Sequence, residues 1–309
     1  MKRTLIIGGC GFIGSHLVDR CLLAGAQAAV YDNLSVGTRE RLPDAAAANL
    51  NVGDILDTEI LGDVMKAWEP DVIYHLAAIH HIPTCEQNPK LALRVNVEGT
   101  QSVIEARARC APEAKLVLAS TGAIYDVTTA PLRESSAIAP VDVYGIGKRC
   151  CEDLLARATR IAAGQAIVAR LFNTVGARET NPHLVPDILK QLAAGASSIR
   201  LGNLSPKRDY IHVQDVAEAL HALGETDSGP GLSVYNVGSG IEHSVEEVAR
   251  TCVEIAGSNA TVVSDPDRCR RVDRPNQLAD IGKLRQHAGW APRRTLREAL
   301  ADAWKETGL

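Results

Sequence analysis

Short apolar runs alternate with stretches of helical periodicity through the first 170 residues of the chain. This alternation is typical of α/β proteins, in which crossover helices connect the strands of a parallel sheet. The apolar runs predict strands at 3–7, 27–31, 49–54, 71–76, 115–120 and 166–172. The predicted helices occupy the segment that ends near Gly25 and residues 57–68, 86–109 and 141–163.

Beyond Asn173 the pattern loosens and the predicted elements become shorter. A prolyl break at 181–186 precedes a helix that reaches Ala194, and 202–209 is predicted to be a turn-rich loop. Further helices are predicted at 213–224, 245–256, 281–288 and 296–306, with a strand end at 234–238. We therefore expect one domain over 1–172, with a return segment near 208–238, and a smaller α/β domain made mainly of 173–309.

A glycine-rich turn follows the first predicted strand. Gly8, Gly11 and Gly14 have GxxGxxG spacing and open an amphipathic segment. The first glycine permits the tight turn, the second lets a pyrophosphate approach the backbone, and the third lets the helix pack closely on the strand. The free N–H groups and the positive end of the helix then face the phosphates. The turn predicts a dinucleotide site.

An acidic residue ends the second predicted strand. Asp32 follows Gly14 by 18 residues, close to the spacing at which a carboxylate binds the adenosine ribose hydroxyls. A carboxylate about 5 Å from the 2′-phosphate of NADP would cost roughly 3 kcal/mol at an effective dielectric constant of 20. Arg39 and Arg41 follow in the loop and would soften this repulsion. Asp32 favours NAD over NADP.

Composition narrows the class of protein. The chain has 309 residues and a formal net charge of −4, which gives no reason to expect a nucleic-acid partner. Its apolar runs are too short to cross a membrane. The basic residues Lys2 and Arg3 resemble the start of a signal peptide, but the apolar run that follows stops at Gly8. We expect a cytoplasmic protein whose chain begins directly with a strand.

The eight cysteines are scattered and form no C-x-x-C pair, which gives no support to a zinc site. We expect free thiols in a reducing compartment and no metal. Cys10 lies in the glycine turn, where the helix N-terminus would lower the pKa of its thiol.

Tyr144 and Lys148 are four residues apart within a predicted helix, so their side chains share one face. An ammonium group beside a phenol stabilises the phenolate and is expected to lower the pKa of the tyrosine. Such a tyrosine removes a hydroxyl proton during hydride transfer and returns it afterwards. Ser120 and Thr121 end the preceding strand and offer a hydroxyl to the same substrate oxygen. The alternative is a solvated Tyr and Lys on a helix surface.

Together these motifs resemble the NAD-dependent nucleotide-sugar epimerase/dehydratase family of extended short-chain dehydrogenases/reductases. The resemblance covers essentially the whole chain. It rests on 8–18, 32–35, 53–55, 75–78, 96–100, 120–125, 144–148, 170–173, 208–213, 236–238 and 289–290. It implies a Rossmann-type, doubly wound parallel sheet with a smaller C-terminal substrate-binding domain. It also implies NAD held through the catalytic cycle.

The resemblance assigns roles to individual residues. Tyr144 would be the catalytic base, Lys148 its partner, and Thr121 the hydroxyl that binds the reacting sugar oxygen. The cofactor-binding residues would be Gly8, Gly11, Phe12, Ile13, Gly14, Asp32, Asn33, Ser35, Gly37, Asp54, Ile55, Leu76, Ala77, Ala78, Asn96, Ser120, Tyr144, Lys148 and Phe172. The substrate-binding residues would be His80, His81, Thr121, Tyr144, Asn173, His183, Leu184, Val185, Arg208 and Arg274. Asn96 and Ala77 would line the NAD groove, and the two arginines are candidates for the diphosphate.

The chain departs from the family pattern at two places, one of which bears on the reaction and the other on the substrate. Sugar-nucleotide 4,6-dehydratases of the family have Asp-Glu directly after the threonine, and this chain has Gly122 and Ala123. Neither residue can transfer a proton, so the resemblance favours 4-epimerisation through a 4-keto sugar. The family often has R-P-G-D where this chain has Arg274-Pro275-Asn276-Gln277, which puts the uridine contact in doubt.

Several alternatives stay open at this point. His80 and His81 would bind a polar or acidic sugar group or would be ordinary loop residues, and a metal site lacks an evident third ligand. Arg268, Arg270 and Arg271 would meet a diphosphate or lie in a solvated loop. A dehydratase, an oxidoreductase using the same 4-oxidation, and a non-catalytic NAD sensor remain alternatives to the epimerase. The family implies a homodimer, for which the candidate apolar positions are Leu91, Val95, Leu154 and Leu155. A UDP-sugar is the favoured partner.

Overall fold

Seven parallel strands form the large sheet of this computed structural model, which describes residues 1–162, 164–179, 181–269 and 274–308. The strand order is β10-β6-β5-β4-β1-β2-β3. The bounds are β1 (Arg3–Ile7), β2 (Gln27–Asp32), β3 (Leu50–Val52), β4 (Val72–His75), β5 (Lys115–Thr121), β6 (Gln165–Leu171) and β10 (Gly231–Val237). The chain crosses from β1 outward in both directions, as in a Rossmann-type fold. The predicted fold class is confirmed.

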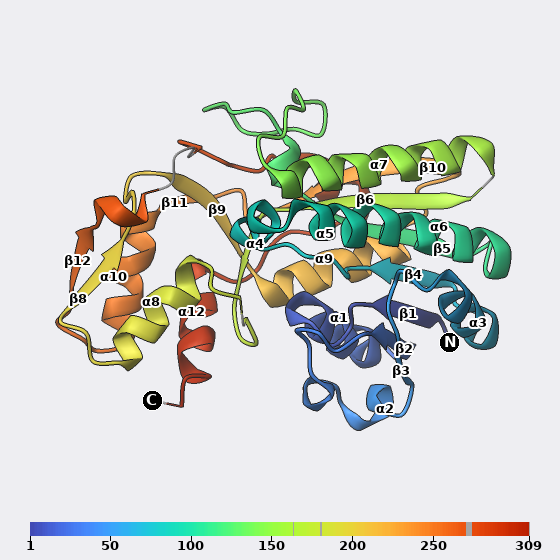
Figure 1. The fold of residues 1–309 in the computed structure, drawn as a ribbon, viewed down its shortest axis with the longest axis horizontal. Coiled ribbons are helices and arrows are strands. Elements are labelled where there is room, and N and C mark those ends of the chain that lie inside the picture. Colours follow the sequence, from blue (N-terminus) through green and yellow to red (C-terminus); the bar gives the residue numbers. More distant parts are fainter. Residues whose placement is uncertain (163, 180, 270–273, 309) are drawn as a thin grey trace.

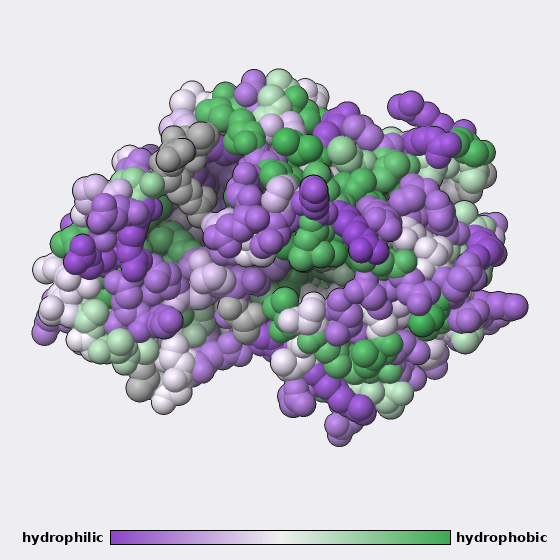
Figure 2. All heavy atoms as spheres, viewed as in Figure 1, coloured by the Kyte–Doolittle hydropathy of each residue, from purple (hydrophilic) through white to green (hydrophobic). Residues whose placement is uncertain are grey.

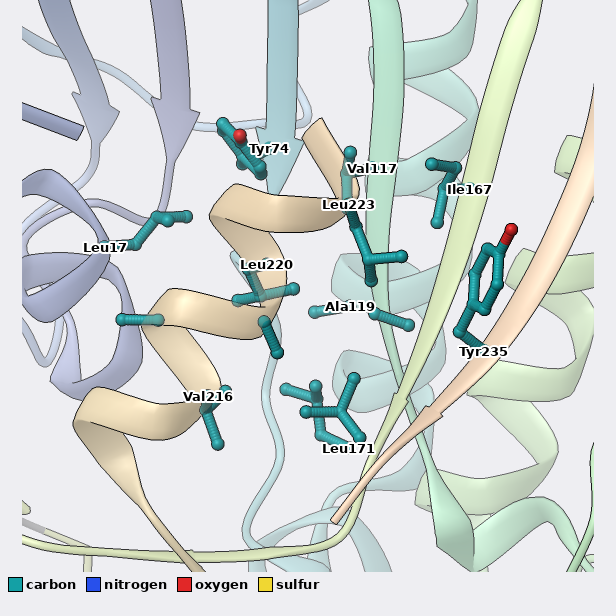
Figure 3. Close-up of a cluster of buried hydrophobic side chains, with 14 of the residues drawn as sticks. Leu17, Tyr74, Val117, Ala119, Ile167, Leu171, Val216, Leu220, Leu223 and Tyr235 are labelled. Atoms are coloured by element: carbon teal, nitrogen blue, oxygen red, sulfur yellow. The ribbon is translucent and has the colours of Figure 1, made fainter. Parts of the chain in front are cut away.

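Helices cover both faces of this sheet, which is why its strands read as nearly continuous apolar runs. Side chains alternate along each strand, so Ile6 belongs to one core and Leu5 and Ile7 to the other. One core packs against α1 (Phe12–Leu23) and α9 (Val213–Glu225), and Figure 3 shows α9 lying over the sheet residues of this cluster. The other packs against α3 (Thr58–Trp68), α6 (Gly99–Cys110) and α7 (Val143–Ile161).

A smaller lobe lies beside the end of the large sheet (Figure 1). Its strands are β7 (Asn173–Val175), β9 (Lys207–His212) and β11 (Glu242–Ser244) in one sheet, and β8 (Ser198–Leu201) and β12 (Thr261–Ser264) in another. Its helices are α8 (Leu184–Ala193), α10 (Val245–Ile255) and α12 (Leu296–Lys305), which share a separate core with β8 and β9. The predicted loop over 202–209 was wrong at its end, because Lys207 begins a strand that pairs with both β7 and β11.

The predicted helix over 86–109 is divided in the structure. It consists of α4 (Ile82–Gln87), α5 (Pro89–Leu93), a π-helical turn (Arg94–Glu98) and α6. Pro89 occupies the first turn of α5, where its missing N–H costs nothing. A π-helical turn inside a helix is frequent at functional sites, and this one carries Asn96.

The remaining elements are short. They are α2 (Asp44–Ala47), α11 (Gly282–Ala288) and the 3₁₀ turns Arg39–Arg41, Gly122–Ile124 and Pro266–Arg268. Within the described ranges, we find no helix with the length and apolar character required to span a membrane.

Candidate active site

A large cleft runs along the carboxyl ends of the parallel strands and continues between the sheet and the smaller lobe. Its volume is about 1740 Å³, and its lining includes Gly8, Asp32, Thr121, Phe172 and Arg208. Ligands of open α/β sheets bind outside these strand ends. All the cofactor and substrate residues predicted from the sequence line this cleft, with the exception of Asn96. The cleft has room for a dinucleotide together with a second ligand of similar size.

The glycine turn leaves no room for side chains. Gly8 has a φ of +86°, and a Cβ added there would lie 2.6 Å from the backbone nitrogen of Ala77. A Cβ on Gly14 would lie 2.0 Å from the carbonyl oxygen of Gly8. Helix α1 begins just after Gly11, and no side chain caps its first N–H groups. These donors and the helix dipole therefore fit the pyrophosphate of a dinucleotide.

Asp32 is fixed at the wall of the cleft. Its Oδ2 accepts a hydrogen bond from the Cys10 backbone nitrogen at 2.9 Å, and its Oδ1 accepts one from Leu34 at 2.9 Å. The side chain of Asn33 donates to Asp54 at 3.1 Å, which joins two of the residues predicted to bind the cofactor. Burial, followed by the nearby charge of Asp32, raises the pKa of Cys10 to about 12. The predicted lowering of this thiol pKa was therefore wrong.

Asn96 lies behind the cleft wall rather than on it. The side chain is 2% exposed, and its Oδ1 accepts from the backbone nitrogen of Ile79 while its Nδ2 donates to the carbonyl oxygen of the same residue, both at 2.8 Å. The prediction that Asn96 lines the NAD groove is therefore corrected, because its side chain is buried and bonded to Ile79. Asn96 holds the loop after β4, and Ala77 and Ala78 of that loop line the cleft.

The start of α7 holds Tyr144 at the cleft. Asp142 caps the helix by accepting a hydrogen bond from the Gly145 nitrogen at 2.7 Å, and Glu86 accepts from the Val143 nitrogen at 2.8 Å. Lys148 lies one turn further along and is buried, and its Nζ donates to the carbonyl oxygen of Ala119 at 2.8 Å.

Thr121 at the end of β5 shares a side-chain hydrogen bond with Tyr144. The structure thus brings Thr121, Tyr144 and Lys148 together on the lining of the same cleft. Burial raises the pKa of Tyr144, and the hydrogen bond with Thr121 opposes this shift. Burial also lowers the pKa of Lys148. The sequence predicted that Lys148 would lower the pKa of Tyr144. In the protein without a bound cofactor, burial instead raises this pKa.

A buried polar network lies beneath this group. Ser120 donates to Glu152 at 2.5 Å, and Glu152 forms a two-point ion pair with Arg170 at 2.8 and 3.0 Å. Arg170 also donates to the Tyr125 hydroxyl at 2.9 Å, and that hydroxyl donates to Asn236 at 2.6 Å. The network joins β5, α7, β6 and β10. It therefore fixes the relative positions of β5, which carries Thr121, and α7, which carries Tyr144. Apart from Glu152, these residues belong to the family motifs, but their positions along the chain did not reveal that they bond to one another.

The two arginines predicted to bind a diphosphate differ in their surroundings. The guanidinium of Arg274 donates to the carbonyl oxygens of Tyr125 at 2.6 Å and Ala123 at 2.8 Å. Two of its nitrogens are therefore already hydrogen-bonded to the backbone. Arg208 lines the cleft, and its Nη1 donates to the carbonyl oxygen of Arg274 at 2.6 Å. Arg268 also lines the cleft and pairs with Asp187 at 2.9 Å. Arg270 and Arg271 lie outside the described residues.

Three histidines meet at the end of the cleft formed by the smaller lobe. The ring of His183 lies 5.6 Å from that of His80 and 5.3 Å from that of His81, measured between centroids. Burial lowers the pKa of His80 to about 4, so its ring is neutral near pH 7. Glu179 joins this group, and burial raises the pKa of its carboxyl to about 7. The sequence did not reveal Glu179, because it lies about 100 residues from His80 in a segment without a recognisable motif.

A fourth histidine, His75 at the end of β4, makes the stability of the protein depend on pH. The ring is 1% exposed, its Nε2 lies 3.0 Å from the Thr100 hydroxyl, and its Nδ1 is buried without a partner. Burial, with a contribution from Lys148, lowers its pKa to about 3. The unfolded chain, with a histidine pKa of about 6.5, binds the proton more tightly, so stability falls as the pH drops below about 6.5.

We expect His75 to lower the free energy of unfolding by about 2 kcal/mol between pH 7 and pH 5. Urea unfolding at both pH values measures this loss. A His75→Gln variant should show a pH dependence smaller by about the same amount. An unchanged dependence in the variant would contradict the assignment.

Comparison with known proteins agrees with this geometry. The family described as NAD dependent epimerase/dehydratase matches residues 4–238. A UDP-glucose 4-epimerase of Azospirillum brasilense is 32% identical, over 94% of this chain and 87% of its own length. The structure of a Thermus thermophilus UDP-glucose 4-epimerase in complex with NAD superimposes with a TM-score of 0.89, at 31% identity and 98% coverage of both chains.

A UDP-glucose 4-epimerase of Thermotoga maritima, solved with UDP-glucose, gives a TM-score of 0.90 at 27% identity and covers 99% of this chain and 98% of its own. The match extends through both lobes, and the glycine turn of this chain has the shape that a dinucleotide requires. The chain therefore belongs to the NAD dependent epimerase/dehydratase family.

Proposed function

We propose that this protein is an NAD-dependent nucleotide-sugar 4-epimerase that acts through a transient 4-keto sugar nucleotide. The observation that carries the proposal is the convergence of Thr121, Tyr144 and Lys148 on the lining of a cleft whose glycine turn is shaped for a dinucleotide. The UDP-glucose 4-epimerases to which the chain is similar support the same reaction.

The proposed roles follow from the geometry. Bound NAD would supply a hydride acceptor for the sugar and a positive ring that favours the phenolate form of a neighbouring tyrosine. Tyr144 takes the proton of the 4-hydroxyl and later gives it back. Thr121 holds the same oxygen by a hydrogen bond. Lys148 supplies a positive charge one helical turn away and is anchored to the carbonyl of Ala119.

The residues beside Thr121 favour epimerisation over dehydration. Gly122 and Ala123 form a 3₁₀ turn directly after Thr121 and carry no group that can transfer a proton. Water elimination needs an acid and a base beyond the hydroxyl-oxidising set. Returning a hydride to the other face of a keto sugar needs no additional group.

We propose a UDP-sugar as the substrate class, because the relatives named above are UDP-glucose 4-epimerases. The test is incubation of the purified protein with UDP-, dTDP-, GDP- and CDP-sugars, with products resolved by chromatography and proton NMR. The proposal predicts a product of unchanged mass, epimeric at C4, with no net formation of NADH. A product that has lost water would show a dehydratase instead of an epimerase. A stable oxidised sugar would show an oxidoreductase. NAD binding without turnover across the panel would favour a sensor.

We also propose a homodimer that pairs α5 and α7. Exposed apolar side chains on and next to these helices include Leu91 at 51% and Ile146 at 45%, and Figure 2 shows hydrophobic patches where Figure 1 draws α5 and α7. Of the other candidates named from the sequence, Leu155 is 1% exposed and belongs to the core of the subunit. Val95 and Leu154 pack partly against the same core.

Leu91→Glu places a charge on this face and is expected to convert the dimer to a monomer, which light scattering after size-exclusion chromatography measures. Leu23→Glu is the matched control, because Leu23 is 84% exposed at the end of α1. A monomeric wild-type protein would contradict the proposed dimer.

The proposed location is the cytoplasm, and it rests on cysteine usage. All eight cysteines are free in the structure, as expected in a reducing compartment. The proposed domain division at residue 172 would separate the first six strands of the large sheet from the smaller lobe, with β10 returning to the sheet edge next to β6.

A further inference from the structure

Side chains from two distant segments converge at the end of the cleft formed by the smaller lobe. His80 comes from the loop after β4, whereas Glu179 and His183 lie between β7 and α8. One ligand atom from each of the three residues lies within 4.8 Å of the others. All three residues line the cleft.

The donor set has a definite chemical preference. Two imidazole nitrogens and one carboxylate oxygen are ligands of Zn²⁺ and of similar divalent transition metals. Three protein ligands leave one coordination position open, and all three residues line the cleft, where a ligand could occupy that position. Hard cations such as Mg²⁺ and Ca²⁺ prefer sets made of oxygen alone.

The ring of His80 is held in place by two contacts. It forms a hydrogen bond with the backbone of Ala78, and its Nε2 lies 3.1 Å from the side-chain amide nitrogen of Asn181. A histidine ligand commonly donates its other ring N–H to a backbone carbonyl, which directs the remaining lone pair at the metal. Because Nε2 already has the Asn181 amide as its hydrogen-bond partner, a metal bound at this nitrogen would take the place of that amide.

The residues next to the three candidate ligands also make defined contacts. The Nδ1 of His81 lies 2.8 Å from the Thr84 hydroxyl, and its ring packs edge-on against His183. Asn181 donates its backbone N–H to the Glu179 carboxylate at 3.3 Å. His81 therefore supports the orientation of His183, whereas Asn181 holds both His80 and Glu179 and would give up its bond to His80 when a metal binds.

We propose that His80, Glu179 and His183 form a binding site for a divalent transition metal within the cleft. The open coordination position would accept an oxygen atom of the ligand in the cleft. The metal site is separate from the proposed hydride transfer, because it uses none of Thr121, Tyr144 and Lys148.

The test is calorimetric titration of the metal-stripped, full-length protein with Zn²⁺, without added NAD or sugar nucleotide. We expect one zinc ion per chain. Glu179→Gln keeps the shape of the side chain and should weaken binding by at least about tenfold, and His183→Ala should do the same. His243→Ala on β11 removes a histidine that does not line the cleft and should bind zinc like the wild type.

Absence of stoichiometric zinc binding would overturn the site and leave the cluster as a hydrogen-bonding wall for the sugar. Binding that is unchanged in both Glu179→Gln and His183→Ala would show an adventitious ion only. Circular dichroism of each variant checks that the fold is retained. Because the titration contains neither NAD nor sugar, its outcome is independent of whether the protein is an epimerase.

Discussion

Tyr144→Phe is expected to slow epimerisation by roughly 10²- to 10⁴-fold, the usual contribution of a positioned acid–base group. The phenylalanine ring fills the same space at the start of α7, so the caps provided by Asp142 and Glu86 should persist. Only the hydroxyl that meets Thr121 and the substrate oxygen is removed. The rate of conversion, followed by product chromatography, should therefore fall while the content of bound NAD stays as in the wild type.

Tyr235→Phe is the matched control for this experiment. Its hydroxyl lies 3.2 Å from the His287 ring, on β10 and away from the cleft lining. Losing that contact should cost about 1 kcal/mol of stability and leave the turnover rate unchanged. Near-normal turnover in Tyr144→Phe would remove the tyrosine from the proposed mechanism.

Gly14→Ala is expected to abolish the retention of NAD. The added Cβ would lie 2.0 Å from the Gly8 carbonyl oxygen and 2.8 Å from the Gly9 Cα, both of which are backbone atoms that cannot turn aside. Relief requires the helix to move away from the strand, which opens the turn that would receive the pyrophosphate. Cofactor released by denaturation of the purified variant, measured by absorbance, should fall below a tenth of the wild-type amount.

Gly147→Ala tests the same chemical change at a helical position with room for it. A Cβ there would lie 3.5 Å from the nearest side-chain atom, on Leu93, which is an ordinary contact. Alanine is favoured over glycine inside a helix by about 1 kcal/mol, so this variant should keep its NAD and gain stability. Normal NAD content in Gly14→Ala would contradict the assignment of the turn as the pyrophosphate site.

The sequence predicts the large sheet well because its signals are local. Each buried strand is an apolar run bounded by turns, and the glycine spacing places the cofactor turn directly. Most strands of the smaller lobe escaped prediction because they are short: β7 and β11 have three residues each, and β8 has four. Such segments are too short to show a period, and only pairing with partners far along the chain makes them strands.

Roles at the site were predictable only where a motif fixes them. Tyr144 and Lys148 share a helix face, so their spacing alone predicts that they act together. Asn96 was predicted to line the cleft but lies behind its wall, because the sequence does not show how deeply a side chain is buried. The environment also changed the electrostatics, since burial raises the pKa of Tyr144 despite the lysine one turn away. The contacts of Arg274 with backbone carbonyls and the approach of Glu179 to His80 depend on tertiary structure alone.

The central claim is that hydride leaves C4 of the sugar and returns to the same carbon. The most direct measurement uses UDP-glucose deuterated at C4, with the product examined by NMR and the solution followed for NADH absorbance. The proposed epimerase predicts a C4 epimer that keeps its deuterium at C4, with no accumulation of NADH. Deuterium lost to solvent, a stable keto sugar with NADH, or a dehydrated product would contradict it.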